Sequence, residues 1–582
     1  MDINWLLLED CTQDNGVAQI FQNPIDMIIA NNFDEIDGAI AKINAAKKNG
    51  HYLAGFVSYE FGLCFEEKTK NFAKQSNFPL LVFGVFNAPR VTNSGAIGRL
   101  LRRKNKGAGF RLSQVQYSDD LKSYTKKFNK IKTNIEKGDI YQANLTIKVD
   151  MDFEGSPIAL YEKLRGRQKA KYCAYIDFSD AQILSLSPEL FFEKNRQNIE
   201  THPMKGTIST DKENAFDILL NDEKQRAENL MITDLMRNDL AKISRAGSVK
   251  VPKLFEIETY KTLLQMISRV KARLLPNKNA ADILCSISPA GSITGCPKIR
   301  AEELIFEAEN APRDIYCGAI GMIEPKGNAK FNVAIRTSII KENKLTLGIG
   351  SGIVYDSIAK KEYQECLLKS QFLTKAQDDF AIFETLLWTQ EIGYQNLEMH
   401  LARLKNAAQH FGFRFDEDYI KHMLKNTADN IAWNKARIKI SIDETSDEVA
   451  IFEFENDNKD WKIALSKTII QTNNPWIYYK TTNRKTYDNE WQYYKDRGID
   501  EVIYQNEKGE LTEGTRTNIF VDFGDKKLAT PPISCGILNG ILRQKLIENG
   551  DAYERILHAD DLNAAQHIYV GNSLRGLKKA IF

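Results

Sequence analysis

The spacing of apolar residues divides the chain into helical and extended stretches. Residues 119–137 follow a helical pattern, and residues 140–153 alternate between apolar and polar side chains in the manner of a strand. Residues 222–244 are rich in helix formers and predict one long helix. Helices are also expected at residues 359–376 and 397–411. The pattern therefore mixes long helices with strands instead of favouring one type of element.

Further strands are predicted where short apolar runs are bounded by glycine or by charged pairs. They cover residues 52–62, 173–178, 182–194, 316–325, 330–343 and 344–357. With 582 residues the chain is long enough for two or three separate cores. A polar connector at residues 375–379 places a module boundary near residue 378, since the sequence pattern changes after it. We therefore expect an amino-terminal region at 1–110, a core at 111–377 and a second module at 378–582.

Composition and charge exclude several classes of protein. With 79 basic and 77 acidic residues, the net charge of +2 gives no overall field that would attract nucleic acid or an anionic membrane. The basic run at residues 99–106 is the main local exception and predicts a solvated loop. No apolar stretch approaches the ~20 residues that span a bilayer. The amino terminus lacks the basic start of a secretory signal, and the eight cysteines are scattered, so we expect a cytoplasmic protein.

A lysine inside a predicted short proline-glycine turn, Pro203–Thr207, is the most informative residue of the first module. Three longer motifs follow it, AENLMITDLMRNDL at 227–240, SPAGSITGCPKIRAEELI at 288–305 and FNVAIRT at 331–337. Together these segments resemble the chorismate-utilising enzymes. Lys205 resembles the branch that makes 4-amino-4-deoxychorismate (ADC), because anthranilate synthases carry a small residue there. The resemblance implies packed antiparallel sheets flanked by helices.

The resemblance to ADC synthases implies a chemical role for two residues. Lys205 would attack ring carbon 2 of chorismate and expel the hydroxyl on carbon 4, after which ammonia adds at carbon 4 and releases the lysine. An ammonium group cannot attack, so Lys205 has to lose its proton first. Glu189 precedes Lys205 by 16 residues, a separation compatible with a hairpin that returns both to one site. Glu189 would protonate the departing hydroxyl.

Other residues of the first module match family positions that bind metal or substrate. Glu228 and Glu365 match the glutamates that hold Mg²⁺, a hard cation that prefers carboxylate oxygens. From spacing alone, Glu365 could simply pair with a lysine one helical turn away. The substrate-binding positions implied by the resemblance are Arg336, Tyr316, Ser292, Gly352, Gln265 and Lys369. Gln265 stands where many members carry histidine, and glutamine can still donate and accept a hydrogen bond.

The source of ammonia is a separate question. The chain contains no cysteine motif of the GxCxGxQ kind found in glutamine amidotransferases. We therefore expect a separate glutamine amidotransferase subunit that supplies ammonia, unless free ammonia suffices.

The second module carries six motifs that occur in the order typical of the fold-type IV pyridoxal-phosphate (PLP) enzymes. They are FETLLW (383–388), HLARL (400–404), YYKTTNR (478–484), LTEGTRTNIF (511–520), TPPISCGILNGILR (530–543) and GNSLRGL (571–577). Within that class they resemble ADC lyase. The resemblance implies a two-subdomain α/β fold, so the whole chain is expected to be α+β.

The same resemblance implies the PLP site. Lys480 matches the Schiff-base lysine, and Glu513 matches the carboxylate that faces the pyridine nitrogen. Arg403 matches the phosphate-binding arginine, and Gly540, Ile541 and Ser573 would present further donors to the phosphate. Lys480 would remove the proton at ring carbon 4 of ADC, and pyruvate would leave to give 4-aminobenzoate for folate synthesis. Leu542 stands where aminotransferases of this class usually carry threonine, which favours a lyase.

Two alternatives remain open at the level of sequence. The chain could join an anthranilate or isochorismate-type synthase to a D-amino-acid or branched-chain aminotransferase. It could also be a regulatory or scaffolding protein with decayed catalytic folds that binds the glutaminase. Fold-type IV enzymes usually dimerise, so a homodimer through the second module is possible.

Overall fold

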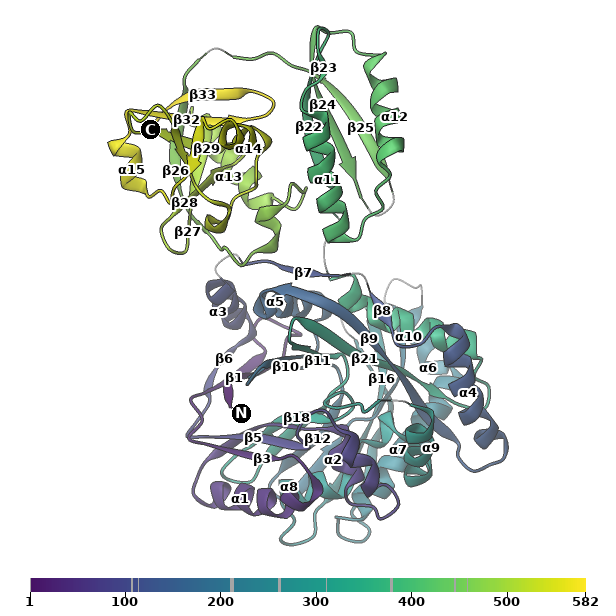
Figure 1. The fold of residues 1–582 in the computed structure, drawn as a ribbon. Coiled ribbons are helices and arrows are strands. Elements are labelled where there is room, and N and C mark those ends of the chain that lie inside the picture. The colour runs from purple at the N-terminus through teal and green to yellow at the C-terminus, as the bar shows by residue number, and fades with distance from the viewer. Residues whose placement is uncertain are drawn as a thin grey trace. The chain divides into compact units, whose positions relative to one another are not determined.

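The computed structural model describes residues 2–105, 108–113, 115–209, 214–259, 263–309, 311–376, 380–443, 446–457 and 459–582. The chain forms two compact units (Figure 1). The first unit comprises Met1–Leu101, Val115–Asp152 and Tyr161–Ala376. The second comprises Arg102–Gln114, Phe153–Leu160 and Gln377–Phe582, so it takes two short segments from the first half of the chain.

The first unit contains two antiparallel sheets. One follows the order β17 (Gly295–Cys296), β9 (Gln142–Gly155), β21 (Lys344–Ile353), β20 (Thr337–Lys341), β11 (Ala181–Ser187), β10 (Tyr172–Phe178), β1 (Ile3–Glu9), β2 (Val17–Gln22), β6 (Arg90–Asn93). β7 (Phe110–Leu112) and β8 (Gln116–Tyr117) pair with β9. The other follows β14 (Met204–Ser209), β16 (Leu263–Arg273), β13 (Asn198–Thr201), β12 (Leu190–Asn195), β19 (Ala329–Val333), β18 (Ala319–Ile323), β4 (Tyr52–Val57), β5 (Leu81–Phe86), β3 (Asp26–Ala30), with β15 (Lys250–Thr259) on β16.

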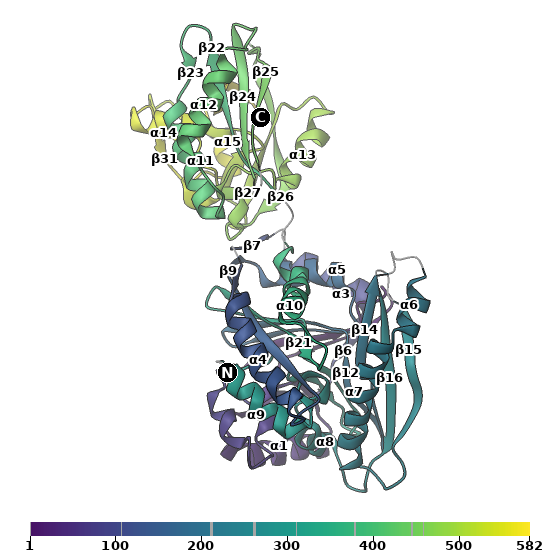
Figure 2. The same cartoon turned by 90° about the vertical axis from the view of Figure 1, so that its right-hand side faces the viewer.

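The two sheets bury an apolar layer between them. Ile176 and Ile183 from one sheet and Phe56 and Val82 from the other belong to one buried cluster. A second cluster covers the other face of the β4–β5 sheet, where Ile43, Ile232 and Ile283 come from helices (Figures 1 and 2). The helices are α1 (Ile36–Lys48), α2 (Tyr59–Leu63), α3 (Ser94–Asn105), α4 (Leu121–Glu136), α5 (Pro157–Gln168), α6 (Ala215–Asn221), α7 (Glu223–Ala241), α8 (Ala280–Ile287), α9 (Lys298–Ala308) and α10 (Ala359–Thr374).

The second unit contains two subdomains, as the fold class predicted. A small antiparallel sheet follows β23 (Gly393–Tyr394), β22 (Ile382–Thr389), β24 (Lys435–Ile442), β25 (Asp447–Glu453), and α11 (Leu397–Phe411) and α12 (Glu417–Ala428) cover one of its faces. A mixed sheet follows β28 (Leu511–Gly514), β27 (Glu501–Asn506), β26 (Trp461–Ile470), β33 (Gly576–Ile581), β32 (His567–Asn572), β29 (Asn518–Asp522), β30 (Leu528–Thr530), β31 (Ala552–Glu554). Its helices are α13 (Lys485–Lys495), α14 (Ile541–Glu548) and α15 (Ala559–Ala564).

Most predicted elements are confirmed, and four differ in an informative way. The strand predicted at 330–343 forms two strands, β19 and β20, which belong to different sheets. The predicted strand at 52–62 ends at Val57 and continues as α2, because Ser58 accepts from the Phe61 N–H and caps a helix. The predicted strand at 182–194 is split at Pro188, which cannot donate to a ladder. The basic run at 99–106 lies in α3 as far as Asn105, so the prediction of a loop is wrong; Lys106 lies outside the described residues. No helix in the described part of the chain is both long and apolar enough to cross a bilayer.

A buried ion pair ties α5 to the first strand of the chain. The Glu9 side chain is fully buried, and Arg165 donates to it from Nε at 2.9 Å and from Nη2 at 2.7 Å. The Tyr161 hydroxyl donates to the same carboxylate at 2.9 Å. Removing one member of such a pair leaves an uncompensated buried charge, which costs more than the pair contributes when intact.

We predict that Arg165→Met destabilises the first unit by about 3–5 kcal/mol, because Glu9 would be left buried and charged. Chemical denaturation followed by tryptophan fluorescence and circular dichroism measures this change. The double variant Glu9→Gln/Arg165→Met should recover part of the lost stability, because it no longer buries the Glu9 charge. A loss below about 1 kcal/mol in the single variant would contradict a charged, desolvated Glu9.

Candidate active sites

Lys205 lies in a β-bulge. Met204 pairs with Ile267 and Thr207 with Gln265, so two residues of β14 oppose one residue of β16. Gly206 takes a φ of 95°, a conformation that L side chains rarely adopt, and this lets the strand bend at the bulge. The sequence analysis placed Lys205 in a turn; the bulge replaces that turn and sets the direction of the lysine side chain.

The Lys205 amine lies between helix α7 and a glycine of strand β21. Its Nζ is 3.6 Å from Glu228 Oε2 on α7, and the lysine side chain is 20% exposed. A Cβ atom added to Gly352 on β21 would lie 2.9 Å from the same Nζ. Since β14 and β21 belong to different sheets, the bare backbone at Gly352 is what gives the amine its room.

Glu189 lies between β11 and β12 and is 5% exposed. Burial raises the pKa of its carboxyl to about 7, and Ser292 and Lys205 oppose that rise. The hairpin of β12 and β13 returns the chain from Glu189 to Lys205, as the separation in sequence predicted. The Ser292 hydroxyl lies close enough to Glu189 to lower this pKa, although the geometry between the two groups is not that of a hydrogen bond. The carboxyl can therefore hold a proton at neutral pH.

A second carboxylate, Glu365 on α10, also neighbours the lysine. Burial raises the pKa of Glu365, but Lys369 and then Lys205 lower it below its usual value. Glu365 pairs with Lys369 at 2.7 Å, and Lys369 Nζ donates to the Gly350 carbonyl at 2.9 Å. The described residues contain no cluster of three or more side chains suited to a metal ion. Glu228 on α7 and Glu365 on α10 nevertheless bring carboxylate oxygens from two helices near the Lys205 amine.

Gln142 is a residue of this site that the sequence analysis missed. Both polar atoms of its side chain are buried without a hydrogen-bond partner. Its Nε2 lies 3.2 Å from the point where a Gly352 Cβ would stand, beside Lys205. Burying an amide without a hydrogen-bond partner costs free energy, so the unpaired Gln142 side chain is a candidate to contact a bound molecule. No sequence motif marks Gln142 as a site residue, and only its position beside Gly352 in the structure identifies it.

Of the remaining predicted residues, Gln265 lies on a strand, whereas Tyr316 precedes β18 and Arg336 lies between β19 and β20, so their part in the site stays a prediction. Gln265 is buried on β16, opposite Thr207. Tyr316 packs where a side chain on Gly348 would overlap its ring, and it lines a cavity of about 680 Å³. Arg336 has a φ of 49° and donates from Nη1 to Gln168 Oε1 at 2.9 Å. The structure thus groups Lys205, Glu189, Ser292, Gly352, Glu228, Glu365 and Lys369, and the part of Arg336 in this site stays a prediction.

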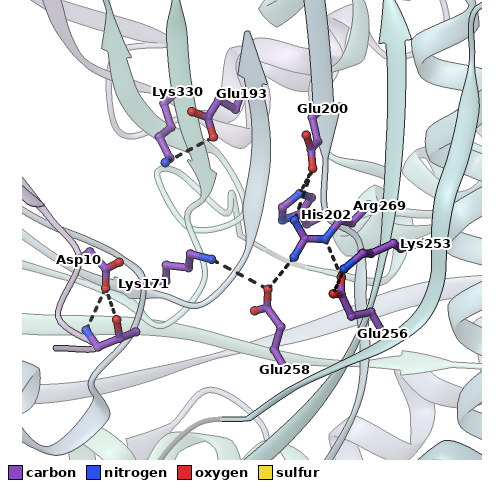
Figure 3. Close-up of polar contacts among 11 residues, drawn as sticks. Asp10, Lys171, Glu193, Glu200, His202, Lys253, Glu256, Glu258, Arg269 and Lys330 are labelled. Carbon is purple, nitrogen blue, oxygen red and sulfur yellow. Dashed lines mark hydrogen bonds and ion pairs between the residues drawn. The ribbon is translucent and has the colours of Figure 1, made fainter. Parts of the chain in front are cut away.

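A network of ion pairs supports the strands that carry Lys205 (Figure 3). Arg269 on β16 contacts Glu256 at 2.6 Å and Glu258 at 3.4 Å, both on β15. It also lies 3.8 Å from Glu200 on β13, which pairs with His202 at 2.5 Å. Because His202 stands three positions before Lys205, this network fixes the strand segment that leads into the bulge.

In the second unit, Lys480 lies next to a fully buried carboxylate. Its Nζ is 3.9 Å from Glu384 Oε2 on β22, and the Glu384 side chain is 1% exposed. Glu384 also accepts from Arg403 Nε at 2.6 Å and Nη2 at 2.9 Å, and His400 Nδ1 lies 2.7 Å from it. The sequence analysis quoted the motif that contains Glu384 but gave this residue no role. The Glu384 carboxylate connects Arg403 and His400 of α11 to Lys480.

Charges around Lys480 set the proton affinities of the pair. Burial raises the pKa of Glu384, but Arg403, Lys480 and His400 hold it well below its usual range. Desolvation, aided by repulsion from Arg403 and Arg484 and opposed by Glu384, lowers the pKa of Lys480 to about 8. A lysine with this pKa can exchange a proton near neutral pH.

Lys480, Glu384, Arg403, Leu538 and Asn539 line a cavity of about 430 Å³. Arg403 Nη1 donates to the Asn539 carbonyl at 2.9 Å, beside the start of α14 at Ile541, whose N-cap is Gly540. Asn518 Nδ2 donates to Glu513 Oε2 at 3.3 Å and to the Leu538 carbonyl at 3.0 Å.

Burial raises the pKa of Glu513 to about 8. Ser573 lies in the turn after β32, a strand that pairs with β29 at Asn518 and Gly571. These contacts place Glu513 and the start of α14 near the same cavity wall.

Comparison with known proteins agrees with this division. Residues 5–375 match the chorismate binding enzyme family, and residues 381–579 match the class IV amino-transferase family. Aminodeoxychorismate synthase component 1 of Salmonella typhimurium is 39% identical over 333 residues, covering 53% of this chain and 73% of that protein. Anthranilate synthase component 1 of Aquifex aeolicus is 35% identical over 287 residues, covering 47% and 58%.

Among solved structures, anthranilate synthase component I of Streptococcus pneumoniae superimposes with a TM-score of 0.54 and 27% identity. That match covers 62% of this chain and 92% of the other.

We predict that Lys205→Met raises the pKa of Glu189 above about 7, because the lysine charge favours the ionised carboxyl. The carboxyl C=O stretch, measured by infrared difference spectroscopy against Glu189→Gln across a pH series, reports this titration. Lys330→Met, which removes a lysine paired with Glu193 at 3.4 Å, serves as the control and should leave it unchanged. A midpoint near the usual value of a glutamate in otherwise intact protein would show that Glu189 is not desolvated.

Proposed function

The chain belongs to the family of chorismate binding enzymes, and from that membership we propose that it makes 4-aminobenzoate in two consecutive steps. The first site would convert chorismate and ammonia to ADC. The second would eliminate pyruvate from ADC, and the product would serve folate synthesis. The observation that carries the proposal is the position of the Lys205 amine. It lies near Glu189 and Glu228, in space that a side chain at position 352 would occupy.

A lysine in this place supports amination at carbon 4. The neutral Lys205 amine would form a bond to ring carbon 2 while the bond between carbon 4 and its hydroxyl breaks. Glu189, protonated near neutral pH because of its burial, would give its proton to that hydroxyl, which leaves as water. Ammonia would then bond to carbon 4 as the bond from Lys205 to carbon 2 breaks.

Two carboxylates on different helices fit a magnesium ion at this site. Glu228 and Glu365 would hold Mg²⁺, because carboxylate oxygens are its preferred protein ligands and the rest of its shell can come from water and substrate. The ion would neutralise a substrate carboxylate. Lys369 would release Glu365 to the metal while it keeps its bond to the Gly350 carbonyl.

The second site fits pyridoxal phosphate, which its family implies. Lys480 would hold the aldehyde carbon, Arg403 and the N–H groups at the start of α14 would hold the phosphate, and Glu513 would face the ring nitrogen. When bound, PLP supplies an electron sink for the bond-breaking step. Lys480 would then move the proton at ring carbon 4 of ADC, and its pKa of about 8 matches that task.

Ammonia would come from a partner. We propose a separate glutamine amidotransferase subunit, since the sequence lacks the corresponding cysteine motif. The relatives include both aminodeoxychorismate synthases and anthranilate synthases, so similarity alone does not choose between products. Lys205 favours ADC because it can bond covalently to the ring, which a small side chain cannot do.

We predict that the purified protein with chorismate, ammonium, Mg²⁺ and PLP forms 4-aminobenzoate and no anthranilate. Lys205→Ala should reduce ADC formation by a factor of at least about 10³, the size expected for loss of a nucleophile. Lys480→Ala should form ADC at the wild-type rate and accumulate it. Liquid chromatography with fluorescence detection separates the two aminobenzoates. Anthranilate from the wild type would overturn the first assignment, and ADC without 4-aminobenzoate would overturn the second.

We also predict that Gly352→Ala lowers the rate of ADC formation about 10²-fold, because its Cβ would displace the Lys205 amine from 2.9 Å. The conversion of ADC to 4-aminobenzoate should be unchanged. Gly166→Ala is the control, since its Cβ would meet nothing within 4 Å. Full ADC formation by Gly352→Ala would show that the close approach of Lys205 to β21 has no part in the reaction.

A further inference from the structure

Cationic side chains follow one another around the space at Lys480. Arg437 and Lys439 on β24 alternate with the buried Ala436 and Ile438, so they face away from the core beneath α11 and α12. Lys439 Nζ lies 4.9 Å from the ring centroid of Phe383, and Lys480 Nζ lies 5.2 Å from the same ring. This face of β24 therefore turns toward the second site.

Aromatic rings on and after β25 lie between the cations of β24 and Arg575 of the carboxy-terminal sheet. The Arg437 guanidinium lies 4.3 Å from the ring centroid of Phe452, its partner on β25. Phe454 stands two positions further on, and the Arg575 guanidinium lies 5.6 Å from its ring. Arg575 is thus a near neighbour of the β24 face, although it comes from the turn between β32 and β33.

Hydrogen bonds link the segment after Lys480 to the turn that carries Arg575. Arg484 stands four positions after Lys480 and donates from Nη2 to the Thr515 carbonyl, next to Arg516. Asn572 Nδ2 donates to the Arg516 carbonyl at 3.1 Å, which joins Arg516 to the turn that carries Arg575. The Arg516 guanidinium itself lies 3.6 Å from the ring centroid of Trp491. These contacts link six cationic residues, called the cation ring below: Lys480, Arg484, Arg516, Arg575, Arg437 and Lys439.

The three outer arginines, Arg437, Arg516 and Arg575, form no ion pair with a carboxylate in the described ranges of the chain. The acidic groups nearby bind other donors: Glu501 accepts from the Arg516 backbone N–H at 3.1 Å and from the Thr517 hydroxyl at 2.8 Å, and Asp457 pairs with Lys578 at 3.2 Å. Loss of hydration lowers the pKa of Arg516 to about 10; attraction by Glu501 opposes this shift, and repulsion by Arg575 and Arg484 adds to it. Guanidinium groups gathered in this way, without a direct ion pair, attract anions.

We propose that Arg437, Arg516 and Arg575 bind the two carboxylates of the substrate of the second site. This inference rests on the proposed function and deepens it, because it assigns the residues that select the substrate. A guanidinium offers paired N–H donors that match a carboxylate. ADC carries two carboxylates and 4-aminobenzoate carries one. The cation ring therefore favours the dianionic substrate over its monoanionic product and over amino acids with one carboxylate.

The test compares Arg516→Gln, Arg575→Gln and Arg437→Gln in the full-length PLP-bound protein with purified ADC. Each change should raise KM about 10- to 100-fold, as expected for a lost charge-assisted hydrogen bond, and change kcat less than about threefold. Arg516→Lys should recover part of the loss. Arg497→Gln is the control, because its guanidinium also covers a tyrosine ring, at 3.6 Å, in the same unit.

A binding measurement separates recognition from catalysis. In a Lys205→Ala background, chorismate is a dicarboxylate that the first site cannot convert, and its binding at the second site should perturb the absorption of bound PLP. 4-Aminobenzoate should do so only at much higher concentration, and the arginine variants should abolish the difference. If a variant fails to fold, the KM of the wild type still has to rise with ionic strength.

Two results would overturn the inference. One is an unchanged KM for ADC in all three glutamine variants while the wild type makes 4-aminobenzoate. The other is equal binding of chorismate and 4-aminobenzoate by the PLP-bound protein. A wild type that does not convert ADC would instead contradict the proposed function, so the two failures are distinguishable.

Discussion

The first site depends on a strand without side chains along one face. Gly348, Gly350 and Gly352 alternate along β21, and Tyr316 and Lys205 occupy space that Cβ atoms at the first and last of these would take. Because Lys205 comes from the other sheet, the site exists only where the two sheets approach this closely. The bulge at Gly206 sets the direction of the lysine, and the partly exposed ion pairs at Arg269 hold the strands around it.

Both sites place an amine next to a buried carboxyl group, and the surroundings give the two carboxyls opposite properties. Glu189 has few polar partners, so burial dominates and its pKa rises to about 7. Glu384 is equally buried, but Arg403, Lys480 and His400 keep it ionised. The first carboxyl can therefore deliver a proton, while the second can only hold cations in place. One chemical group thus serves as an acid in one unit and as an anchor in the other.

Residue patterns predicted the elements whose packing is local. The helices α4, α7, α10 and α11 follow from apolar spacing and helix-forming residues, and most strands follow from alternation. The helix at the basic run was missed because only two large apolar residues of α3, Ile97 and Leu101, are buried. The roles of Gln142 and Glu384 were missed for another reason. Their partners lie far away in the sequence, at Gly352 and at Lys480, and no local pattern carries such contacts.

The position at which nitrogen joins the ring tests the central claim most directly. Lys480→Ala protein would be given chorismate and ¹⁵N-labelled ammonium, and the accumulated intermediate would be examined by nuclear magnetic resonance. Attack by Lys205 at carbon 2 predicts ¹⁵N bonded to carbon 4, because the lysine blocks carbon 2 until ammonia arrives. Label at carbon 2 would mean that ammonia attacks there directly, and the role proposed for Lys205 would be wrong.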